Sequence, residues 1–79
     1  MNREEEGKKF LMLIQHAGLT AFKFACRTEY SQTRIYNMIK GNADLRSLTV
    51  AKAIKFAKVL GFVSLDEFYN ACGIDLVND

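Results

Sequence analysis

The 79-residue chain lacks proline and tryptophan and has only two cysteines, Cys26 and Cys72. The absence of proline removes the residue that most strongly interrupts helices. Two cysteines 46 positions apart, with no Cys/His cluster, predict two unrelated thiols and no metal site. No apolar run approaches the roughly 20 residues that a membrane span needs. The first residues lack the apolar stretch of a signal peptide, so we expect a cytoplasmic protein that does not associate with membranes.

What remains is typical of a single folded all-α domain. Hydrophobic residues make up 49% of the chain and charged residues 25%, as in globular proteins. We expect one domain over residues 1–79, with a core over about 4–72 and a tail over 73–79. Residues that favour helix N-caps alternate with glycines that favour helix ends. They predict five helices, over residues 4–17, 20–27, 31–40, 49–60 and 64–72, with a loop over 42–48.

Apolar residues recur at the three- and four-residue spacing of helices that bury one face. On the fourth helix this places Lys52, Lys55 and Lys58 on the solvent side. Ser64 and Glu67 at the start of the fifth helix form a predicted capping box. The residues expected to face the core are Phe10, Leu13, Ile14, Ala17, Phe24, Ala25, Ile35, Met38, Val50, Ala53, Ile54, Ala57, Leu60, Leu65, Phe68 and Tyr69.

Charge is distributed unevenly along the chain, although the net charge is only +2. Residues 20–58 contain eight basic and two acidic side chains, residues 1–19 are neutral, and residues 59–79 carry four acids. A basic block of this kind favours a polyanionic partner such as DNA.

The second and third predicted helices, joined by the turn at residues 28–31, have the spacing of a helix-turn-helix. If Ile35 and Met38 point inward, the polar side chains of the third helix share one outward face. Gln and Asn can pair with adenine, Arg with guanine, and Thr can contact the thymine methyl group. We therefore expect DNA base contacts from Gln32, Thr33, Arg34, Tyr36 and Asn37, with Arg34 at the edge of the face.

Contacts to DNA phosphates are expected from helix N-terminal groups and from basic or amide side chains around this motif. Such contacts add affinity but little sequence information. The candidates are Thr20, Lys23, Arg27, Ser31, Lys40, Asn42 and Arg46.

Several short motifs in one register resemble the Cro/CI-type (XRE) helix-turn-helix family, which is lambda-repressor-like. They are LT at 19–20, FA at 24–25, Thr28, Ser31, Ile35, Met38, Gly41, KFAKVLG at 55–61 and SLDEF at 64–68. The resemblance covers about residues 8–70. It implies a five-helix bundle whose third helix enters the major groove, commonly in a symmetric dimer with recognition helices roughly 34 Å apart.

The chain departs from the family pattern at several positions. Ala21 stands where the family commonly has a DNA-contacting glutamine, and Ile14 stands where it often has a base. Glu29 stands where the family turn usually has glycine, and a left-handed conformation at this residue would carry an energetic cost. The junction before Ser64 is one residue longer than the commonest pattern.

Apolar residues near the C-terminus, namely Tyr69, Ile74, Leu76 and Val77, exceed what one core needs. One interpretation is a tail that folds back over the first helix. The other is a homodimer through the C-terminal helix and tail. A small monomer rarely exposes many apolar side chains together, and the sequence leaves both open.

The sequence predicts a sequence-specific, repressor-like transcriptional regulator that binds a pseudo-palindromic operator in double-stranded DNA as a dimer. The alternative is a protein-binding adaptor or antitoxin-like partner on the same scaffold, favoured by Ala21, Glu29 and aromatics expected at the surface: Phe22, Tyr30 and Tyr36. We expect no enzyme, cofactor or small-molecule ligand, because His16 has no partner cluster and the capping box accounts for the adjacent acids Asp66 and Glu67.

Overall fold

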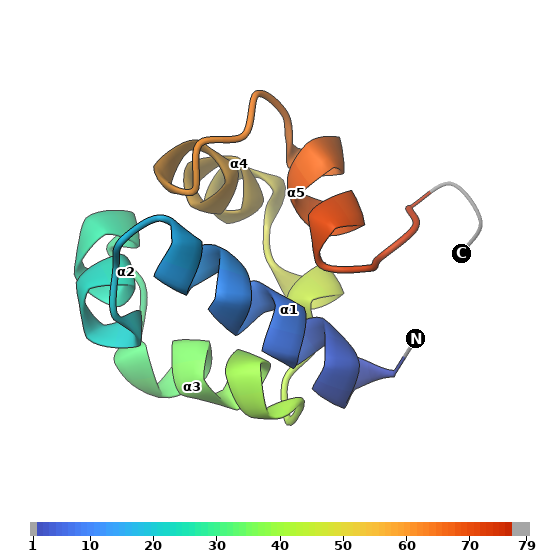
Figure 1. Cartoon of the computed structure of the whole chain (residues 1–79), viewed down its shortest axis with the longest axis horizontal. Coiled ribbons are helices and arrows are strands. Elements are labelled where there is room, and N and C mark those ends of the chain that lie inside the picture. The colour runs from blue at the N-terminus through green and yellow to red at the C-terminus, as the bar shows by residue number, and fades with distance from the viewer. Residues whose placement is uncertain (1, 77–79) are drawn as a thin grey trace.

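The computed structural model describes residues 2–76 and consists of short helices joined by tight connections (Figure 1). In this part of the chain there is no strand, which confirms the predicted all-α class. No helix among these residues is long and apolar enough to cross a membrane. The elements are α1 (Arg3–His16), α2 (Ala21–Thr28), α3 (Gln32–Lys40), a 3-10 helix η1 (Leu45–Ser47), α4 (Val50–Val59) and α5 (Leu65–Ala71).

Helix starts follow the polar side chains that accept hydrogen bonds from the first turn. Thr20, Ser31, Thr49 and Ser64 each accept from the backbone N–H three residues later, as the sequence predicted. Asn2 does the same for Glu5, so α1 begins one residue earlier than expected. In the predicted capping box, the Glu67 carboxylate accepts from the N–H of Val63, one residue before the cap.

The core is centred on four phenylalanines, each supplied by a different helix. Phe10 of α1, Phe24 of α2, Phe56 of α4 and Phe68 of α5 are all fully buried. The Phe56 ring lies 4.9 Å from Phe24, 5.9 Å from Phe10 and 6.2 Å from Phe68, measured between ring centroids. Aromatic pairs at these separations add to the free energy gained by burial.

Phe56 also explains why the expected stripe on α4 was wrong at two positions. Burying its large ring rotates α4 so that Ala53, Phe56 and Ala57 face the core. Val50 and Ile54, predicted to be buried, are 66% and 39% exposed. The expected solvent-side lysines of α4 still lie outside the core cluster.

A few other core predictions also need correction. Ala17, beyond the last turn of α1, is exposed, and Leu13, Leu60 and Leu65 are only half-buried. Tyr30, expected at the surface, is half-buried with its ring 5.3 Å from Phe56. The remaining predicted core residues are buried, joined by residues outside the predicted stripes: Leu19, Ala21, Leu45, Leu48, Cys72 and Ile74.

The start of the tail belongs to the fold. Ile74 is 1% exposed, and its N–H donates to the carbonyl of Tyr69 at 2.9 Å. The Tyr69 hydroxyl donates to the carbonyl of Leu45 at 2.9 Å, which ties α5 to η1. Leu76 lies beside Val50 and is 37% exposed. Val77, part of the predicted apolar excess, lies outside the described residues.

Both cysteines are free thiols, Cys26 at the surface and Cys72 in the core. Burial raises the pKa of the Cys72 thiol to about 12. The reactive thiolate is therefore scarce at neutral pH.

α3 is held in place by a close contact with α1. Gly7 of α1 is buried, and a Cβ atom built on it would collide with the carbonyl oxygens of Met38 and Ile39. Only a residue without a side chain allows this approach. α1 therefore covers the inner face of α3 and leaves its opposite face to solvent along one long side of the molecule (Figure 1).

Candidate nucleic-acid interface

α2 and α3 are joined by a turn that contains a left-handed residue. Glu29 has φ 55° and ψ 43°, and it is the sole non-glycine residue with positive φ among residues 2–76. The N–H of Tyr30 donates to the carbonyl of Ala25 at 3.0 Å, while the buried hydroxyl of Thr28 donates to that of Phe24 at 2.8 Å. The Tyr30 bond caps a carbonyl of the last turn of α2, and the Thr28 bond satisfies the hydroxyl of that buried side chain.

The carboxylate of Glu29 is compensated by lysines of α4. Lys55 forms an ion pair with it, and the Lys52 ammonium donates to the Glu29 carbonyl at 3.3 Å. The hydrogen bond from Lys55, assisted by the charges of Lys55 and Lys52, lowers the pKa of Glu29. The turn therefore presents a neutralised carboxylate rather than an isolated negative charge.

A prediction about stability follows from the turn. Glu29→Gly removes the left-handed strain, and we expect it to raise the thermal unfolding midpoint by about 4 °C or more. Glu29→Ala is the matched control, because it loses the same carboxylate but keeps the Cβ atom. Equal unfolding midpoints for the two variants in circular dichroism melts would contradict the strain argument.

The structure brings the five predicted base-contact residues onto the solvent side of α3. Gln32, Thr33, Arg34 and Tyr36 are exposed, and Asn37 is half-buried. Ile35 and Met38 are buried on the opposite side, as predicted. These side chains therefore lie on the part of α3 that a ligand can reach.

The predicted phosphate contacts lie on α2, on α3 and on the caps and segment next to these helices, with one exception. Thr20 and Ser31 are the N-caps of α2 and α3. The other exposed members are Lys23 and Arg27 on α2, Lys40 at the end of α3, and Asn42 just beyond it. Within the described part of the chain, Lys23, Arg27, Arg34 and Lys40 form no ion pair.

Arg46 is the exception, because its guanidinium holds α1 to the segment before α4. Its Nη2 lies 2.9 Å from Oε2 of Glu6, and its Nη1 lies 3.2 Å from the other carboxylate oxygen. The Glu6 side chain is only 3% exposed, and Asp44 pairs with Arg46 as well. These carboxylates raise the pKa of Arg46. We assign Arg46 a structural role and leave it out of the DNA-contacting set.

The ion pairs of Arg46 with Glu6 and of Lys55 with Glu29 were not predicted from the sequence. Glu6 and Arg46 are 40 positions apart, and no local pattern connects them. The pairing of Glu29 with Lys55 has one local signal, a charged residue in the position of a turn glycine. Among the described residues, no group of three or more His, Cys, Asp or Glu side chains is arranged to hold a metal ion.

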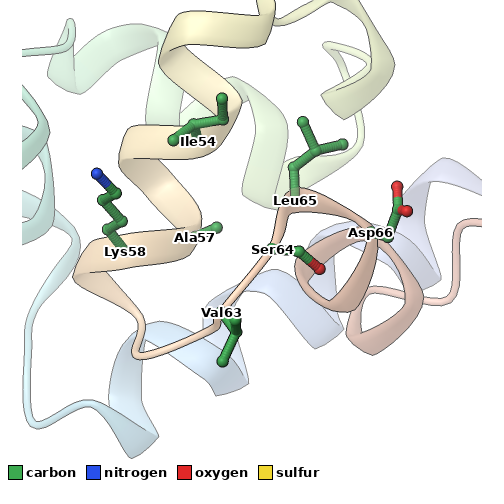
Figure 2. Close-up of a pocket in the computed structure, with 7 residues that line it drawn as sticks. All are labelled: Ile54, Ala57, Lys58, Val63, Ser64, Leu65 and Asp66. Carbon is green, nitrogen blue, oxygen red and sulfur yellow. The ribbon is translucent and has the colours of Figure 1, made fainter.

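Apolar side chains gather on a second surface, between α4 and α5. A hollow of about 380 Å³ is lined by Ile54, Ala57 and Leu65, with Lys58 and Asp66 at its borders (Figure 2). Val63, in the connection between the helices, is 91% exposed. A neighbouring hollow shares Leu65 and includes Val50 and Leu76.

In comparisons with known proteins, no family model, curated protein or solved structure matches the chain. The similarity to the Cro/CI-type family therefore depends on the motifs and their register alone.

Proposed function

We propose that this protein is a sequence-specific DNA-binding regulator of transcription, repressor-like, with α3 as its recognition helix. The observation that supports this most directly is the exposed polar face of α3, together with four cations of α2 and α3 that form no ion pair with any residue of the range 2–76. Base-edge contacts would come from this face, while Lys23, Arg27 and Lys40 would neutralise phosphates. By occupying an operator the protein would block or recruit the polymerase.

We propose further that two copies bind together through α5 and the adjoining tail. Leu76 and Val50 expose apolar surface beside Leu65 in this region. In Figure 1, α5 lies in the upper part of the view, right of centre, and α3 lies along the lower side. A pseudo-palindromic operator requires that the twofold axis of such a dimer leave both α3 helices on the same side. A second copy would also enlarge the small interface of one module.

The salt dependence of DNA binding tests the regulator proposal. Each neutralised phosphate contributes about −0.9 to the slope of log K against log salt concentration. Three phosphate-contacting cations per copy predict a slope of about −3 for one copy and about −5 for a dimer, measurable by fluorescence anisotropy on labelled genomic duplexes. No binding to any duplex at low salt would refute the proposal.

Two lysines on different helices give a matched pair for this experiment. We expect Lys40→Ala to weaken binding to all sequences alike and to reduce the slope by about 1 per copy. Lys58→Ala removes an exposed charge of α4, away from the recognition helix, and should change neither quantity. Equal effects of the two substitutions would place the polyanion elsewhere on the surface.

The second candidate function is a protein-binding adaptor or antitoxin-like partner. The α4–α5 hollow and the exposed rings of Phe22 (56%) and Tyr36 (42%) favour it. Tyr30 no longer does, because its ring packs on Phe56. An adaptor would show no salt-dependent DNA affinity, so the same titration separates the two functions.

A further inference from the structure

Tyr30 forms a fixed aromatic surface beside the start of α3. Its ring is perpendicular to that of Phe56, with 5.3 Å between centroids, and Phe56 is fully buried. Two cations approach this ring: the Arg34 guanidinium carbon and the Lys52 ammonium each lie 6.0 Å from its centroid. Contacts between cations and tyrosine faces at this range are attractive. The Arg34 guanidinium therefore lies over the Tyr30 ring, beside the turn that precedes α3.

The contact with Tyr30 distinguishes Arg34 from the other polar side chains of this face. Successive residues of an α-helix are about 100° apart, so Arg34 and Tyr36 lie on opposite flanks, about 160° from each other. Thr33 and Asn37 lie between these flanks, opposite the buried Ile35. The first two turns of the face are thus lined by uncharged groups.

The chemistry of that uncharged face determines which bases it can read. Arginine and lysine are the side chains that recognise guanine, whereas glutamine and asparagine form paired hydrogen bonds with adenine. Threonine and aromatic side chains contact the thymine methyl group. Residues near the N-terminus of a recognition helix make the base contacts. Lys40, in the last turn of α3, would therefore contact a DNA phosphate rather than a base.

We propose that α3 reads an A·T-rich half-site through Gln32, Thr33, Tyr36 and Asn37, and that Arg34 contacts a phosphate rather than a guanine. This inference rests on the proposed DNA-binding function and specifies its ligand. It also revises the sequence-based expectation that Arg34 is a base contact.

Selection from a library of random duplexes with the full chain at low salt tests the proposal. We expect the enriched half-site to contain A·T pairs at its most restricted positions. Enrichment of a guanine that disappears with Arg34→Ala would overturn the inference while supporting DNA binding. Binding without any sequence preference would also overturn it. The absence of any binding would contradict the proposed function itself.

Two substitutions on one helix then separate base readout from phosphate contact. On the selected duplex and on versions with one A·T pair replaced by G·C, Asn37→Ala should reduce discrimination at one position by about 5- to 150-fold. Arg34→Ala should weaken all duplexes equally and reduce the salt slope by about 1 per copy. Both sites lie outside the buried core, and circular dichroism verifies folding. Loss of discrimination with Arg34→Ala, or unchanged discrimination with Asn37→Ala, would refute the assignment.

Discussion

Gly7→Ala is expected to destabilise the protein by about 2–3 kcal/mol, as overpacking of a tight contact typically does. Helix propensity alone predicts the opposite sign, because alanine is about 1 kcal/mol better than glycine within a helix. The new Cβ atom would meet the backbone carbonyls of Met38 and Ile39, which cannot rotate away as a side chain can. A domain of this size has a total stability of about 4–12 kcal/mol, so the loss would be large.

Urea denaturation followed by circular dichroism measures this difference in the free energy of unfolding. Lys8→Ala is the matched control, because Lys8 is the next residue of the same helix and is exposed. It should change stability by less than about 0.5 kcal/mol. A Gly7→Ala variant as stable as the wild type would show that α1 and α3 are not held at the described distance.

Arg46→Met is expected to destabilise the protein by about 3 kcal/mol, because it leaves the carboxylate of Glu6 buried without its partner. Glu6 is 3% exposed at its side chain, so water cannot replace the two lost hydrogen bonds. The double variant Glu6→Gln, Arg46→Met removes the unpaired charge and should recover part of the stability. A denaturation series of the wild type, both single variants and the double variant gives the coupling energy.

The same series separates structure from DNA contact at Arg46. At temperatures where the Arg46→Met variant is still folded, its salt slope on DNA should equal that of the wild type, whereas Lys40→Ala reduces it. A reduced slope for Arg46→Met would return this residue to the phosphate-contacting set. Unchanged stability would contradict the structural role of the ion pair.

Local signals explain why the helices could be predicted and the core only in part. Thr20, Ser31, Thr49 and Ser64 cap their helices through contacts three residues away, which a sequence displays directly. The inward face of α4 depends instead on Phe56 meeting phenylalanines from three other helices. Val50 and Ile54 follow the helical apolar spacing as regularly as the buried residues do. Periodicity alone therefore predicted, wrongly, that these two side chains face the core.

In the candidate site, too, some features could be predicted from local sequence and others depend on tertiary contacts. The outward face of α3 could be predicted because the buried positions of Ile35 and Met38 determine it. The roles of individual charges could not, since Arg46 pairs with a residue 40 positions away and Arg34 is directed by a ring that the core fixes. Sequence therefore identified the face, and tertiary contacts determine which cations on it are available.

The phenylalanine cluster includes residues of α1, α2, α4 and α5 but none of α3. α3, the proposed recognition helix, is thus joined to this cluster through its contacts with α1 and α2. Segments with fewer buried apolar contacts open at lower free energy than the centre of a domain. Comparing amide hydrogen exchange in α3 with exchange in the aromatic cluster therefore tests whether α3 opens separately, and a bound duplex would slow exchange in α3 first.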